Sequence, residues 1–195
     1  MDKANISRNV EMTGTLVVSS EDFMKVDDTE QLFDAVIKAV EKSFQDNQSK
    51  DGTGLSEVKI DIEFDGYKTL DHKELNADDV KAMSEDELDG VVAEITVNAE
   101  AVDNGIEHEG YQSHDYYEPD EPAYVEGLDD EEVSDEIMSS VEKAFEQFGV
   151  EVSDYEVDEF SAPEWEDVME ANAESALMEA EEARYEMYHE GFYGD

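Results

Sequence analysis

Alternation of apolar and polar residues predicts β-strands in four parts of the chain. The segments are residues 9–19, 58–64, 91–99 and 150–160. Successive side chains of a strand point to opposite faces, so a period of two marks a strand that is buried on one face only. Each strand is therefore expected to present one apolar face to a core and one polar face to solvent.

Apolar residues at spacings of three and four predict two amphipathic helices, at residues 27–46 and 129–148. Asp27 or Asp28 is a suitable N-cap for the first helix, and Gly149 suits the end of the second. Both helices are expected to pack on the core through their apolar stripes. The stripes consist of Leu32, Phe33, Val36, Ile37, Val40 and Phe44, and of Val133, Ile137, Met138, Val141, Phe145 and Phe148.

The two helices also resemble each other in sequence, which indicates an internal repeat. Residues 32–44 align with residues 133–145 at a constant offset of 101, and both copies contain Val-Glu-Lys-x-Phe. The strands before them align at an offset of 79, which matches Leu16 with Ile95. Two βαβ halves predict a ferredoxin-like βαββαβ pseudo-repeat, an antiparallel sheet with two helices on one face. The alternative is that any two amphipathic helices share such features.

The predicted fold class is therefore α+β, in a domain of residues 1–162. Its two halves lie at about 9–65 and 91–160, with a tyrosine-rich acidic loop at 103–127. An acidic C-terminal helix is predicted within residues 163–195, and its apolar stripe is a candidate cover for the free face of the sheet. That stripe consists of Trp165, Met169, Ala173, Ala176, Ala180, Ala183 and Met187.

The net charge of the chain is far more negative than that of an ordinary domain. The 195 residues include 12 Lys and Arg against 57 Asp and Glu, a formal net charge of -45. Solubility needs a magnitude of only about 2–8, and excess charge destabilises a compact state. Residues 99–195 contain two of the basic and 33 of the acidic residues. High charge is also typical of disorder, but 39% apolar residues in periodic positions favour a folded core.

Composition excludes several classes of protein. Cysteine is absent, so disulfides and thiol catalysis are excluded. No apolar run approaches the roughly 18 residues of a membrane span, and residues 1–5 lack the apolar stretch of a signal peptide, so a cytoplasmic location is expected. Anionic membranes and nucleic acids would repel the chain. Its partners are therefore expected to be basic proteins.

Catalytic and metal-binding patterns are incomplete. The calcium-loop-like run at residues 47–52 has Val58 where a carboxylate ligand is needed. His108 and His114 are six residues apart, whereas a zinc-binding helix needs a spacing of four. No phosphate-binding glycine loop, dinucleotide fingerprint or nucleophile elbow is present. We therefore expect no enzyme, no catalytic residue, no metal site and no cofactor.

Acidic and aromatic clusters are the candidate partner-binding residues. Glu166, Glu170 and Glu174 form a helical ridge of like charges, which is unfavourable for the helix unless packing or a partner compensates. The tyrosines of the predicted loop could contact a partner or fold back on the core. The acidic candidates are Asp129, Asp130, Glu131, Glu132, Glu166, Glu170, Glu174, Glu182, Glu186 and Glu190. The aromatic candidates are Tyr111, Tyr116, Tyr117 and Tyr124.

In composition and in ridges such as Glu166-x3-Glu170-x3-Glu174, the chain resembles the small acidic DNA-mimic proteins that viruses of bacteria encode against host defences. Duplex DNA has one charge per roughly 1.7 Å, so a charge of -45 equals roughly 22 base pairs. The resemblance rests on composition and charge pattern only, with no motif specific to one member. It implies an inhibitor in the host cytoplasm that occupies the basic groove of a nuclease, methyltransferase, polymerase or other defence enzyme.

The alternative is a salt-adapted or chaperone-like acidic protein without nucleic-acid mimicry. Depletion of lysine fits salt adaptation, whereas the uneven division of charge between the halves favours the mimic. Folding behaviour at low salt would separate the two. A homodimer is left open by either reading.

Overall fold

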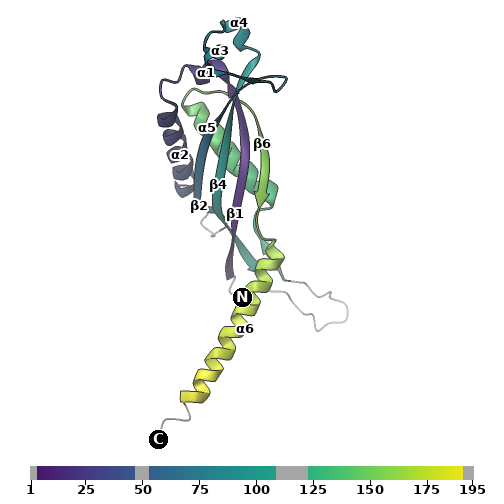
Figure 1. Ribbon diagram of the computed structural model, residues 1–195. Helices are drawn as coiled ribbons and strands as arrows, with labels where there is room; N and C mark the ends of the chain where they lie inside the picture. The colour runs from purple at the N-terminus through teal and green to yellow at the C-terminus, as the bar shows by residue number, and fades with distance from the viewer. Residues whose placement is uncertain (1–3, 47–52, 109–122, 191–195) are drawn as a thin grey trace, which may run out of the picture.

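The computed structural model describes residues 4–46, 53–108 and 123–190 (Figure 1). The described residues run from a long strand to a long helix. In order, the elements are β1 (Ala4–Ser19), α1 (Ser20–Met24), α2 (Thr29–Asp46), β2 (Gly54–Thr69), β3 (Glu74–Leu75), α3 (Ala77–Lys81), α4 (Glu85–Leu88), β4 (Val91–His108), β5 (Tyr124–Glu126), α5 (Asp130–Gln147), β6 (Val152–Ser161) and α6 (Trp165–Glu190).

Within the described residues the strands form one curled antiparallel sheet of six strands. Its order is β3-β2-β4-β1-β6, and β5 pairs with β4 beside this path. The central strand β1 pairs with β4 along its whole length, from Ala4 opposite Glu107 to Ser19 opposite Val92. The predicted α+β class is confirmed. The finer ferredoxin-like prediction is not clearly matched, because the sheet is curled and carries the additional strands β3 and β5.

Helices α2 and α5 cover one face of the sheet (Figure 1). Val36 and Val141 are buried in the same apolar core as Leu16 and Ile95 of the central strands. The predicted stripes therefore face the core, except that Phe148 is 46% exposed. Phe148 lies past the last turn of α5, where Gly149 at φ 80° redirects the chain toward β6.

The predicted loop at 103–127 is partly wrong. Residues 103–108 form the end of β4, and β5 (124–126) pairs back on them as a hairpin. Asp103 takes a core-facing position in the alternation and is fully buried. A charged residue at a core position resembles the end of a strand in a sequence pattern, so the pattern predicted a loop there.

The sequence predicts a C-terminal helix from Pro163, and α6 begins two residues later, at Trp165. It does not cover the free face of the sheet but projects away from it (Figure 1), and residues 171–182 are all exposed. Its alanine stripe offers little apolar area, and the free face of the sheet is itself acidic. Repulsion between two surfaces of the same sign opposes the packing that was predicted.

Candidate functional site

The root of α6 is anchored by Trp165, which fits a slot lined by two glycines. A Cβ atom on Gly127 would lie 2.7 Å from Cζ2 of Trp165, and one on Gly105 would lie 3.1 Å from its Cη2. The indole Nε1 donates a hydrogen bond of 3.1 Å to the carbonyl oxygen of Leu128. The guanidinium carbon of Arg8 lies 4.7 Å from the ring centroid. Larger side chains at either glycine would fill the place of the ring.

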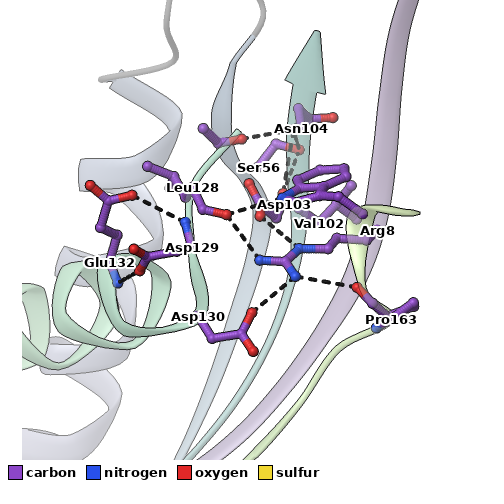
Figure 2. A network of polar contacts seen from close by, with 12 residues as sticks. Arg8, Ser56, Val102, Asp103, Asn104, Leu128, Asp129, Asp130, Glu132 and Pro163 are labelled. Carbon is purple, nitrogen blue, oxygen red and sulfur yellow. Dashed lines mark hydrogen bonds and ion pairs between the residues drawn. The ribbon is translucent and has the colours of Figure 1, made fainter. Parts of the chain in front are cut away.

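Arg8 joins this slot to the sheet and to α5 (Figure 2). It is 3% exposed, and its Nε donates to Oδ2 of Asp103, its cross-strand partner, at 3.0 Å. The other guanidinium nitrogens donate to the carbonyl oxygens of Leu128 at 3.0 Å and Pro163 at 3.2 Å. One of them also forms an ion pair of 2.9 Å with Asp130. A single side chain thus fixes where both α5 and α6 leave the sheet.

Asp103 is the buried counterpart of Arg8 and is only partly satisfied. Its side chain is fully buried, and its Oδ1 has no hydrogen-bond partner among the described residues. Burial raises the pKa of Asp103, although its hydrogen bond with Arg8 acts in the opposite direction. Partial desolvation also raises the pKa of Glu136 on α5, although this residue is exposed, and the Asp103 carboxylate adds to that effect. The folded chain therefore binds protons at these two groups more readily than the unfolded chain does.

We expect stability to rise as the pH falls from neutral toward the ordinary carboxyl pKa of about 4, because the pKa values of both groups are raised. A carboxyl group whose pKa is raised in the folded state stabilises the protein below its unfolded-state pKa. That contribution is lost as the pH rises through its folded-state pKa. Urea unfolding at several pH values measures the slope, and the slope of Asp103→Asn should be shallower than that of the wild type. The self-repulsion of the remaining charges is common to both proteins. Equal slopes would show that Asp103 does not titrate in this range.

The predicted acids in the first turn of α5 have structural partners as well as exposed positions. Asp129 accepts a 2.8 Å hydrogen bond from the backbone N–H of Glu132, and the Glu132 carboxylate accepts one of 3.1 Å from the backbone N–H of Asp129. This is a capping box, which the pattern Asp-x-x-Glu indicates in a sequence. Asp130 pairs with Arg8, and Glu131 is exposed. The first turn of α5 therefore combines a helix cap with an acidic surface.

The predicted acids of α6 lie along a helix that stands free of the sheet. Glu166, Glu170, Glu174 and Glu182 are exposed. The side chains of Glu186 and Glu190 lie outside the described part of the structure, although the backbone there belongs to α6.

Of the predicted tyrosines, only Tyr124 falls within the described residues. Tyr111, Tyr116 and Tyr117 lie outside them. Tyr124 is on β5 and is 54% exposed. Its ring stacks on His108 with centroids 4.5 Å apart, and His108 Nε2 lies 3.0 Å from Oε2 of Glu126. Tyr124 is thus held at the surface by the β4–β5 hairpin, where a partner can reach it.

Sequence reasoning missed a second acidic surface, on the face of the sheet opposite α2 and α5. We call this the open face. Its side chains occupy the polar positions of the strand alternation, which is the signal that could have found them. Glu11 of β1 lies directly opposite Glu100 of β4, and Lys68 of β2 pairs with Glu94. The acids of the open face are Glu11, Asp61, Glu63, Glu94, Glu100, Asp154, Glu156, Asp158 and Glu159.

Within residues 4–46, 53–108 and 123–190, no group of three or more His, Asp and Glu side chains is arranged to hold a metal ion. Within the same residues, no helix has the length and apolar character needed to span a membrane. The candidate calcium-loop run at 47–52 lies outside the described residues. No protein-family model matches the chain, and no curated protein matches it.

Proposed function

We propose that this protein is a non-enzymatic nucleic-acid mimic. It binds a basic nucleic-acid-binding protein, such as a nuclease, methyltransferase, polymerase or other defence enzyme, and sterically excludes its nucleic acid. The observation that carries the proposal is the exposed acidic helix α6, which projects from the body of the protein (Figure 1).

The charge spacing along α6 supports mimicry of a phosphate backbone. The helix has 26 residues, about 39 Å at about 1.5 Å per residue. It contains nine acidic residues and one basic residue, which is one carboxylate per about 4.3 Å. A DNA strand carries one phosphate per about 3.4 Å of axis. The linear charge density of the helix therefore approaches that of one strand.

The same acids do not stabilise the isolated protein. Like charges four residues apart cost an isolated helix about 0.2–0.5 kcal/mol per pair. Contacts of α6 with the rest of the protein are concentrated at its start, where Trp165, Val168 and Met169 are partly buried. Long helices in proteins usually gain most of their stability from packing. A basic partner would supply the compensation that the body of the protein does not.

The proposal predicts competition with nucleic acid. A pull-down from bacterial lysate with mass spectrometry identifies the target, which is then titrated with labelled duplex and with this protein. We expect each to displace the other, and affinity to fall with salt because exposed charges are screened over about 10 Å at 0.1 M ionic strength. The salt slope should be shallower than that of the duplex, since a folded protein has no condensed counterion sheath to release. Simultaneous binding without mutual loss of affinity would refute mimicry and favour salt adaptation.

The triple variant Glu166→Gln, Glu170→Gln, Glu174→Gln measures the contribution of α6 to target binding. Each exposed pair contributes about 0.2–1 kcal/mol, so affinity should fall roughly 3- to 150-fold, more than for any single change. The control variant Asp71→Asn, Glu74→Gln, Asp78→Asn removes the same charge at exposed positions around β3 and α3, at the other end of the molecule (Figure 1). Equal losses for the two triple variants would show that α6 has no special part in binding.

We also propose that the body is a ferredoxin-like pseudo-repeat with added strands. The order of its four long strands, β2-β4-β1-β6, supports this assignment, as do α2 and α5 on one face. An experimental structure with another order of these strands would overturn it.

A further inference from the structure

The open face of the sheet is hollowed as well as acidic. A hollow of about 800 Å³ crosses β2, β4, β1 and β6, and it is lined by Glu11, Lys59, Glu100 and Asp158 among others. A second hollow of about 280 Å³ shares Glu11, Lys59 and Glu100 with the first and extends to Glu57. Because the two share lining residues, they form one groove over the open face.

The charges of this groove are poorly compensated within the protein. Glu11 and Glu100 face each other directly across β1 and β4. Like charges directly opposite each other destabilise a pair of strands. Lys59 of β2 lies opposite Glu100, and Lys68 is paired with Glu94. The acids of the open face outnumber these two lysines, so most of their charge is not neutralised. The face is complementary to a cationic surface.

The size of the groove fits an α-helix. Three strand spacings of about 4.8 Å separate β2 from β6, a width of about 14 Å. An α-helix with its side chains is about 10–12 Å in diameter. Along β4 the lining of the groove runs from Asn98 to Val102, about 14 Å at about 3.4 Å per residue, the length of about two and a half helical turns. The DNA major groove, which also admits an α-helix, is about 12 Å wide.

We propose that the open face is a docking surface for a basic α-helix of the target, the helix that the target otherwise inserts into the major groove. This rests on the proposed function for the identity of the partner, but it places a second contact on the sheet rather than on α6. Two other occupants of such a face are nucleic acid and a second copy of this acidic chain. Both are negatively charged, so the open face would repel them.

The test uses two synthetic peptides of about 16 residues, enough for about four helical turns. One forms a helix with arginines on one face, and the other has the same arginines but contains prolines that prevent a helix. Both are titrated against the full chain and against the variant Glu11→Gln, Glu100→Gln. The variant should bind the helical peptide about 2- to 30-fold more weakly.

The same variant should unfold at a higher temperature than the wild type, because the repulsion between Glu11 and Glu100 is gone. Weaker binding together with greater stability is a result that general structural damage cannot produce. The matched control Asp71→Asn, Asp78→Asn should change the affinity for the helical peptide less than about twofold, since these exposed residues lie outside both the groove and α6.

The inference is overturned if the Glu11, Glu100 variant binds the helical peptide as tightly as the wild type. It is also overturned if the proline peptide binds the wild type as tightly as the helical one, because charge alone would then explain the binding. If duplex and protein bind the target together while the variant still loses the helical peptide, the docking surface stands and the mimicry fails. If competition holds while the groove variant binds normally, the mimicry stands and the docking surface fails.

Discussion

Replacement of Arg8 by alanine is expected to lower the free energy of unfolding by about 3–5 kcal/mol. Removing one partner of a buried ion pair leaves the other charge uncompensated. Asp103 is fully buried, and in wild-type protein one of its oxygens already lacks a partner among the described residues. The loss is a large fraction of the stability of an ordinary domain, about 5–15 kcal/mol. Urea unfolding followed by circular dichroism measures it.

The control for Arg8→Ala is Lys42→Ala. Lys42 and Asp46 form an ion pair of 2.7 Å, but both side chains are exposed and screened by solvent, so its loss should cost far less than the loss of the buried pair. The double variant Arg8→Met, Asp103→Leu should recover much of the stability, because it leaves no buried charge. Trp165 is the only tryptophan of the chain, so its fluorescence reports the state of the slot in each variant. A loss below about 1 kcal/mol for Arg8→Ala would contradict the role assigned to this pair.

Val141→Asp should destabilise the protein to a similar extent or unfold it. Val141 is fully buried on α5 against the sheet. The change removes a buried side chain that contributes about 1.5–3 kcal/mol and inserts a carboxyl group without a partner, at a further cost of several kcal/mol. Thermal unfolding compares the variant with wild type.

Gln147→Asp is the matched control for Val141→Asp, since it adds the same charge at an exposed position of the same helix. A negative charge near the C-terminal end of a helix costs about 0.3–1 kcal/mol. Val141→Ala separates the two contributions, because it removes apolar volume and adds no charge. If Val141→Asp melts at the wild-type temperature, α5 does not pack on the sheet as described.

Alternation in the sequence located the middle of each long strand, because apolar residues there face the core. It failed at the ends of β1 and β4, where Arg8 and Asp103 occupy core-facing positions. A pattern of apolar and polar residues assigns charged residues to the surface, and only the register of the two strands shows that these two neutralise each other. Opposite charges at such positions become informative once strand pairing is known.

The acidic surfaces were predicted incompletely for a related reason. The ridge on α6 is visible in sequence, since its period is local to one helix. The open face assembles Glu11, Glu63, Glu100 and Asp158 from four strands that are distant along the chain. The alanine stripe of α6 likewise predicted packing, but a stripe does not identify the surface that it contacts. Sheet topology is the information that was missing in each case.

The position of α6 also determines how the molecule approaches a partner. A helix with nine acids and one base, projecting about 39 Å from its anchor at Trp165, displaces the centre of negative charge away from the centre of mass. In the field of a cationic protein such a charge distribution experiences a torque, which turns the helix toward the partner before contact. Productive collisions then become more frequent than random orientation would allow. Shortening α6 would therefore slow association even where the final complex does not involve its far end.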